Sequence, residues 1–128
     1  LTDSYGPLSL GVPVRSIYLM AMNTTGDTLW TRTLGNVAAA TSAQSITVAT
    51  NGDLVLAGQS GNGHLTNALV TRVNSSGSQV WQHTYNVATE DALHTLTMLS
   101  DGGFIAAGRT LANTGYQAIL VRKNSFGQ

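Results

Sequence analysis

The side chains that could do chemistry in this chain are few, and the histidines come first among them. His64, His83 and His94 are the three that the sequence contains. Histidines that bind zinc stand at short fixed spacings beside other ligands, and no two of these share such a spacing. We therefore expect structural or solvent-facing roles for all three, and we assign no metal and no cofactor.

The adjacent carboxylates Glu90 and Asp91 are the second candidate functional group. They could act as general acid and base on a glycoside, or bind calcium together with Asp101. Neighbouring residues of an extended strand point to opposite faces, however, which places the pair badly for joint acid/base work. The pattern favours turn-stabilising or strand-capping roles, because short acidic side chains bond readily to nearby backbone amides.

Aromatic side chains at Trp30, Trp81 and Tyr85 form the third candidate, since aromatic faces can stack on sugar rings. The two tryptophans stand 51 residues apart. A residue needed once in each copy of a repeat usually packs between the copies. The pattern therefore favours packing over ligand binding here, and we assign the same role to Leu56 and Phe104.

Composition excludes several classes of function. Six basic and six acidic residues cancel, and charged residues make up 9% of the 128, far below an average share of about a quarter. The chain therefore lacks the basic surface of a nucleic-acid-binding protein. No apolar run is long enough to span a bilayer. With no cysteine, the fold must be stabilised by packing without disulfides.

Internal repetition at a period near 50 residues accounts for the spacing of the two tryptophans. Gly26, Gly77 and Gly127 are separated by 51 and 50 residues, and each follows an asparagine by three positions. Two further alignments agree on the period: TNGDLVLAGQS with SDGGFIAAGRT, and YLMAMNTTG with LVTRVNSSG and ILVRKNSFG. Repeats of this length are typical of propellers and solenoids.

Each copy reads as four short strands joined by turns, with no helical stretch. The candidate strands are rich in aliphatic, aromatic or β-branched residues and are bounded by Gly, Asn, Asp or Ser. Asn-Gly and Asp-Gly pairs, and Asn-x-x-Gly turns, supply hairpins because glycine adopts positive φ freely. The sequence therefore predicts an all-β chain of antiparallel four-stranded meanders. The strands are expected at 17–22, 29–34, 44–50, 54–58, 68–73, 80–85, 94–100, 104–108 and 118–123.

The second strand of each copy, at 54–58 and 104–108, is apolar on both faces. Such a strand needs cover on both sides of its sheet. A period near 50, four strands per copy and two buried faces are together typical of a β-propeller blade.

The order of motifs resembles the bacterial propeller repeats of long secreted and cell-surface proteins. The likeness rests on the DGGF hairpin at 101–104, the AG pair at 107–108, the LVR strand at 120–122, the Asn-x-x-Gly turn and the tryptophan after it. The strand order is also similar to that of WD40 blades. That resemblance implies that 44–50 and 94–100 line a central channel and that the tryptophan strands form the rim.

With the channel-lining strand taken as the first strand of each blade, the chain holds about two and a half four-stranded blades of a partial β-propeller. Residues 1–35 are expected to contain a loop and then strands three and four of one blade, 36–86 a complete blade, and 87–128 the first three strands of a further blade. Propeller rings need roughly four to eight blades. We therefore expect an excerpt of a longer propeller, with assembly of identical copies into one ring as the alternative.

For function, the sequence predicts a non-catalytic binding or structural module of a secreted or cell-surface bacterial protein. The alternatives are a glycan-acting enzyme with its active site in other blades, and a subunit of an extracellular assembly. Expected partners are further blades of the parent chain or identical copies, and a glycan or a cell-surface protein, but no nucleic acid. The expected contact residues lie in the loops 59–67 and 110–117: Ser60, Asn62, His64, Asn113 and Tyr116.

Overall fold

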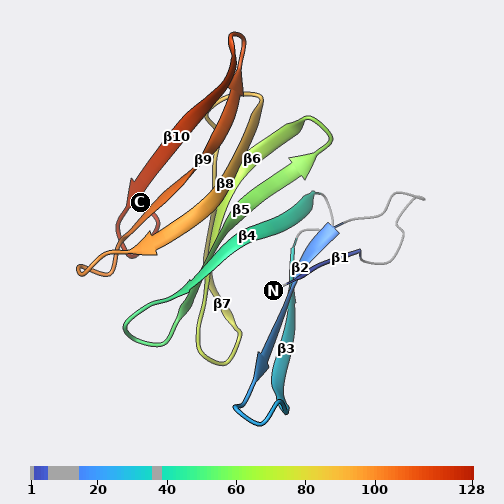
Figure 1. The fold of residues 1–128 in the computed structure, drawn as a ribbon, viewed down its shortest axis with the longest axis vertical. Helices are drawn as coiled ribbons and strands as arrows, with labels where there is room; N and C mark the ends of the chain where they lie inside the picture. Colours follow the sequence, from blue (N-terminus) through green and yellow to red (C-terminus); the bar gives the residue numbers. More distant parts are fainter. Residues whose placement is uncertain (1, 6–14, 36–38) are drawn as a thin grey trace.

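The computed structural model describes residues 2–5, 15–35 and 39–128, and every element in them is a β-strand (Figure 1). The prediction of an all-β chain is confirmed. The strands are β1 (Thr2–Tyr5), β2 (Arg15–Met22), β3 (Thr28–Leu34), β4 (Ala40–Val48), β5 (Leu54–Asn62), β6 (Leu65–Val73), β7 (Gln79–Tyr85), β8 (Glu90–Met98), β9 (Phe104–Ala112) and β10 (Gly115–Lys123).

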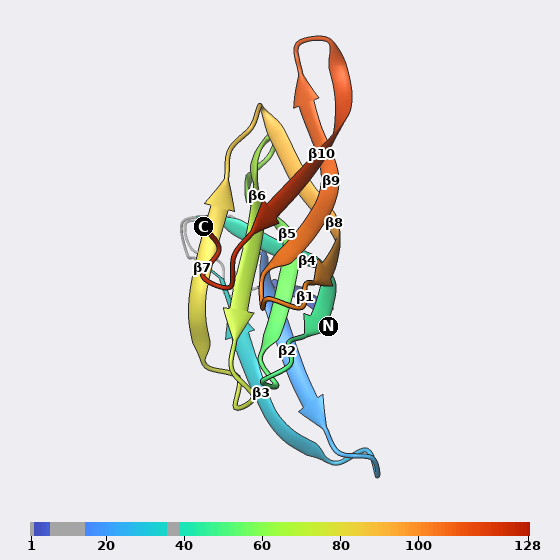
Figure 2. The same ribbon diagram turned by 90° about the vertical axis from the view of Figure 1, so that its left-hand side faces the viewer.

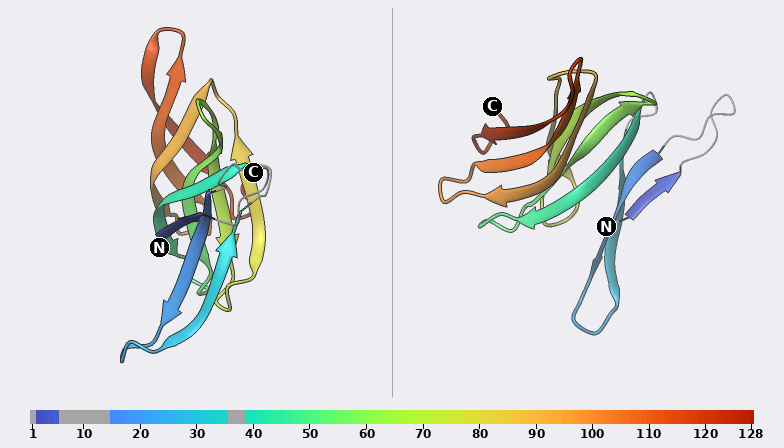
Figure 3. Two further views of the ribbon diagram at one scale, coloured as in Figure 1. Left: turned by 90° about the vertical axis from the view of Figure 1, so that its right-hand side faces the viewer. Right: turned by 45° about the horizontal axis from the view of Figure 1, so that its top comes forward.

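Strand pairing gives a three-stranded sheet, β1–β3, and a seven-stranded sheet, β4–β10, and we divide the second sheet at its single parallel pair to obtain three successive units. Unit 1 consists of β1–β3, unit 2 of β4–β7 and unit 3 of β8–β10, and within each unit neighbouring strands pair antiparallel in chain order. Figure 2 shows β4, β5, β6 and β7 side by side. A single parallel pair, Thr66 with Glu90, joins β6 to β8. The described strands form no closed ring, and the units follow one another across the right-hand view of Figure 3.

Two expected loops are wrong, because the strands on either side continue through them. The pairing of β5 with β6 extends to Asn62 opposite Leu65, and that of β9 with β10 extends to Ala112 opposite Gly115. The segments 59–67 and 110–117 are therefore hairpin ends with two-residue turns. Their Ser, Thr, Asn and Gly content suggests loops, but the backbone ladder satisfies their polar groups within the sheet.

A further correction concerns the start of the chain, where a loop was expected. Thr2–Tyr5 is strand β1 and pairs with β2, with Thr2 opposite Tyr18. Tyr18 matches Leu69 of the second copy, and Leu69 lies opposite Gly58 in β5. Strand β1 therefore occupies the place beside β2 that the second half of β5 occupies beside β6. The remainder of the expected loop, 6–14, lies outside the described residues.

The hydrophobic core lies between units and not within any one of them. A single-layer sheet has two faces, and alternate side chains of a strand point to opposite faces. In β5 one face packs toward unit 1 and the other toward unit 3. The cluster between units 1 and 2 consists of Ile17, Leu19, Leu34, Leu56, Leu69 and Val73, with Trp30, Ala43 and Leu54 packed against it. The cluster between units 2 and 3 consists of Val55, Ala57, Ala68, Val70, Leu93, Leu96, Phe104 and Ala106, with Trp81, Tyr85, Met98, Ile119 and Val121 packed against it.

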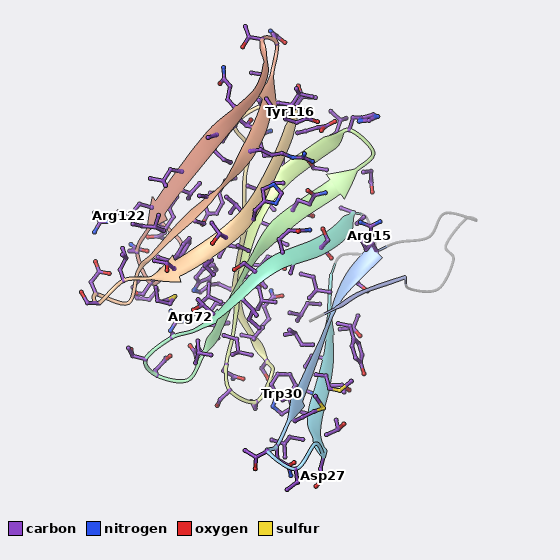
Figure 4. All side chains as sticks on the ribbon, viewed as in Figure 1. Arg15, Asp27, Trp30, Arg72, Tyr116 and Arg122 are labelled. Atoms are coloured by element: carbon purple, nitrogen blue, oxygen red, sulfur yellow. The ribbon has the colours of Figure 1, made fainter. Side chains whose placement is uncertain are left out.

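A tryptophan contact recurs at both junctions between units. The indole Nε1 of Trp30 donates to the carbonyl of Ser75 at 3.1 Å, and that of Trp81 donates to the carbonyl of Ser125 at 3.1 Å. Each acceptor lies in the Asn-x-x-Gly turn of the following unit. Figure 4 shows Trp30 of β3 directed toward the turn that precedes β7. One tryptophan hydrogen bond thus recurs at both junctions.

Replacing Gly77 or Gly26 by alanine separates the strain of the turn from the contact between units. Both have φ close to +90°, so alanine costs each variant about 1–2 kcal/mol of unfolding free energy. At Gly77 the added Cβ also falls 2.7 Å from Arg32 Cγ and 2.9 Å from the Trp30 ring, which adds about 1–3 kcal/mol. In urea unfolding, Gly77→Ala should therefore lower the midpoint more than Gly26→Ala does. Equal midpoints would contradict the tight contact.

Candidate functional site

A polar cavity of about 120 Å³ lies where the hairpin ends of units 2 and 3 meet. It is near the end of the molecule that carries Tyr116 in Figure 4. The turn of the β5–β6 hairpin forms one wall, and β8 with β9 forms the other. The residues that line it are Gln59, Gly63, His64, Thr66, Glu90, Ala92 and Arg109.

The carboxylate of Glu90 is the centre of this site. Its Oε1 lies 2.8 Å from Nδ1 of His64, and its Oε2 accepts from the hydroxyl of Tyr116 at 3.0 Å. Because a carboxylate only accepts, Nδ1 of His64 carries the proton in this hydrogen bond. His64 comes from the β5–β6 turn, whereas Glu90 begins β8 and Tyr116 lies in β10. The three side chains therefore connect unit 2 to unit 3.

Electrostatics at the site favour an ionised Glu90. The hydrogen bond from His64, followed by that from Tyr116, holds the pKa of the Glu90 carboxyl below its usual range. Arg109 adds a smaller attraction and places its guanidinium 4.9 Å from the centroid of the Tyr116 ring. The side chain of His64 is 94% exposed and that of Glu90 only 16% exposed. The site thus has a sheltered anion inside a rim of exposed donors.

The neighbouring carboxylate, Asp91, is turned to the other face of β8 and does not share this site. It is fully buried, accepts from the amides of Val87 at 2.6 Å and Ala88 at 3.2 Å, and forms a short hydrogen bond with the hydroxyl of Thr110. Asp91 therefore anchors the entry into β8, which is the strand-capping role expected from the sequence. The two carboxylates cannot act jointly on one substrate.

Of the five contact residues expected from the sequence, the structure brings two together, His64 and Tyr116, through Glu90. Ser60 and Asn62 end strand β5, and the Asn62 side chain accepts from the amide of Ala40 at 3.3 Å. Asn113 is an exposed turn residue outside the cavity lining. These three lie in the same hairpin ends without joining the site.

Sequence reasoning did not select Arg109, and it considered Glu90 only as half of a carboxylate pair. Both side chains lie on the cavity side of the sheet. Glu90 of β8 is opposite Leu111 of β9, and Arg109 is two positions from Leu111 in β9, so it points to the same face. The signal that could have found them is the length of the ladder. Once β8 is extended back to Glu90, the two charges fall on one face.

The other histidines have separate places. The Nε2 atom of His83 lies 2.9 Å from the carbonyl of Phe126, and its ring is 5.1 Å from that of Trp81. His94 is exposed in β8. Within the residues that the structure describes, no three His, Asp or Glu side chains gather in a way that could hold a metal ion. The same part of the chain contains no helix long and apolar enough to cross a membrane.

A carboxyl titration tests the arrangement around Glu90. In the intact chain, ¹³C NMR should give Glu90 a pKa below that of an exposed glutamate. His64→Ala should raise the pKa most, and Tyr116→Phe should raise it less, because these hydrogen bonds rank in that order. A lowered folded-state pKa contributes stability above the unfolded pKa, and this contribution is lost as pH falls through the folded value. Glu90→Gln should therefore remove part of the acid dependence of unfolding. An unchanged Glu90 pKa in His64→Ala would contradict the geometry.

Comparisons with known proteins give no further identification. No protein-family model matches the chain, and no curated protein matches it either. What the chain binds must therefore follow from its own geometry.

Proposed function

We propose that this chain is a non-catalytic binding module of β-propeller type, in which each unit is a blade and the cavity at the hairpin ends receives a glycan. The observation that carries the proposal is the hydrogen-bonded group of His64, Glu90 and Tyr116. It holds polar side chains from two units in fixed positions beside a cavity that is open to solvent. In this reading 1–35, 36–86 and 87–128 are the successive blades.

The propeller interpretation draws support from the way in which unit 2 is covered. Val55 and Val70, on one face, pack against unit 3, and Leu56 and Leu69, on the other, pack against unit 1. All four are at most 1% exposed. A sheet that is covered on both faces by sheets of its own kind is the arrangement of a blade within a propeller. The recurring tryptophan contact gives the junctions one geometry, which a radial array requires.

The chemistry of the cavity suits a ligand rich in hydroxyl groups. Glu90 and the free Nε2 of His64 can accept hydrogen bonds, and Arg109 can donate them. The Tyr116 side chain, on a residue that is 58% exposed, offers an aromatic surface at the rim. A sugar presents hydroxyl donors and acceptors around an apolar ring face, so it can use both kinds of contact. A protein partner at the same rim is the outcome that would replace the glycan.

The proposal assigns no catalysis to the described site. Glycoside hydrolysis commonly uses two carboxyl groups that flank the scissile bond. Asp91 is held by backbone amides on the opposite side of β8, so the acidic pair of the sequence contributes a single carboxylate to this cavity. We further propose a secreted or cell-surface location in a bacterium, which rests on the resemblance of the repeat motifs.

Glycan-array screening of the full chain, followed by calorimetry on the glycans retained, tests this function. Tyr116→Ala should weaken binding about tenfold, equal to about 1.4 kcal/mol, because the aromatic rim is lost. Asn113→Ala is the matched control and should bind as the unaltered chain does, since Asn113 is exposed in the turn of the same hairpin but, unlike Tyr116, makes no hydrogen bond to Glu90. Mass spectrometry of the incubated glycan should show no new products.

Two results would overturn the proposal. Cleavage of the glycan that disappears in Glu90→Gln would make the site catalytic. Retention of glycans that is equally strong in Tyr116→Ala would place the binding surface elsewhere.

A further inference from the structure

The turn between β2 and β3 in unit 1 has the same construction as its counterparts in units 2 and 3. The amide of Asn23 donates to Asp27 O at 2.9 Å, and the amide of Asp27 donates to the Asn23 side chain at 2.9 Å. The matching distances are 2.8 and 2.9 Å for the turn that begins at Asn74, and 3.0 and 3.0 Å for that at Asn124. All three turns are therefore preformed in one geometry.

In units 2 and 3 this turn receives side chains from the unit before it. A Cβ built on Gly77 would meet the ring of Trp30 at 2.9 Å, and one built on Gly127 would meet the ring of Trp81 at 3.2 Å. A Cβ built on Gly26, with φ of +90°, meets no other atom of the described chain within 4 Å. The turn of unit 1 therefore has the geometry of the two turns that contact a tryptophan, but no tryptophan of the described chain lies against it.

The sheet face beside this turn is exposed in unit 1 and buried in unit 2. Met20 is 48% exposed and Met22 is 58% exposed. The residues at the same repeat positions in unit 2 are Thr71 and Val73. Both are 0% exposed, and Val73 packs in the cluster between units 1 and 2. Exposed methionines in a row are adaptable apolar contacts. The apolar face and the turn form one continuous surface on β2.

We propose that this surface of unit 1 is a docking site for a β-strand that carries tryptophan, in the manner of β3 and β7. The indole N–H of the incoming tryptophan donates to the carbonyl of Thr24, which matches Ser75 and Ser125. The partner is a further unit of this repeat type. This inference rests on the proposed propeller architecture and names the chemistry of its next contact.

Strand β7 shows which side chains the partner strand needs. Besides Trp81, its His83 Nε2 lies 2.9 Å from the carbonyl of Phe126, and its Tyr85 hydroxyl donates to the carbonyl of Gly127 at 2.8 Å. Three alternate side chains of one strand thus reach three successive carbonyls of the next turn. A β7-type strand at unit 1 would meet the carbonyls of residues 24–26 in the same way.

A second copy of this chain is a poorer occupant. Its two tryptophans, Trp30 and Trp81, already donate to the carbonyls of Ser75 and Ser125 within the chain. A second copy could offer the exposed face of unit 3, where Leu120 is 72% exposed although its counterpart Val70 is 0% exposed. That face would cover the methionines but would place no tryptophan against the turn that contains Gly26.

The test uses the full chain and a backbone-cyclised hairpin of residues 68–85, which joins the paired residues Ala68 and Tyr85 and is used once cross-strand NOEs show the same pairing in the isolated hairpin. The amides of residues 23–27 of the ¹⁵N-labelled chain should shift on titration, and the hairpin indole proton should move downfield. A hairpin with Trp81→Phe keeps a ring but loses the N–H donor, so it should bind about tenfold more weakly. Met20→Asp in the chain should abolish the shifts.

The matched control is Thr24→Ala, which retains the backbone carbonyl and should bind the hairpin normally. No shift at millimolar hairpin, or equal affinity of the Trp81→Phe hairpin, would overturn the inference. Light scattering that shows association of the chain with itself, abolished by Leu120→Asp, would make a second copy the occupant and overturn it as well. Glycan binding is measured on the same samples. Retained glycan binding with no hairpin binding would remove this inference alone, whereas loss of glycan binding with intact hairpin binding would remove only the glycan assignment.

Discussion

The structure depends on one constraint: each unit is a single layer of strands with two apolar faces, and no helix in the described chain is available to cover either face. Val55 and Leu56 are neighbours in β5 and point in opposite directions, and each is at most 1% exposed because a different unit lies over it. Fully burying a side chain of this size contributes about 1.5–3 kcal/mol. Stability is therefore shared between units, and it is greatest for the unit that has a neighbour on each side.

Apolar contact alone would let the sheets slide over each other, since it has no preferred direction. Several directional contacts between units lie at the Asn-x-x-Gly turns. Besides the tryptophan bond, Arg72 Nη1 donates to the carbonyl of Ser125 at 3.2 Å while Nε lies 2.8 Å from Asp53 Oδ2. The bond to Arg72 holds the pKa of Asp53 below its usual range, so this ion pair persists into mildly acid solution. Arg122, the third-unit counterpart of Arg72, has a side chain that is 69% exposed and lies 3.9 Å from Asp101.

The sequence predicts the repeat-based features well and the site poorly, for one physical reason. Strands and turns recur, so the glycines at 26, 77 and 127 could be recognised by spacing and assigned to turns, as they are in the structure. The sequences of the hairpin ends do not recur, and their polar residues look like loops although the ladder runs through them to Asn62 and Ala112. The positions of Glu90 and Arg109 depend on that extended register. Their partnership with His64 also depends on how two units are set side by side, which no local pattern contains.

Neighbouring positions of one strand have different roles, and this difference explains where a binding site can arise in such a repeat. Asp91 and its counterpart Thr41 are both buried, and both bond to the chain near the start of their strands, so this position serves the fold in either copy. Glu90, next to it, is matched by Ala40 in the second copy, which has no polar group to offer. The turn ends of the units must fit a neighbour's tryptophan, whereas the hairpin ends carry no such demand. The side chain at position 90 can therefore differ between copies while the tryptophan contact at the turn ends is retained, and that freedom is what makes the hairpin ends suited to recognition.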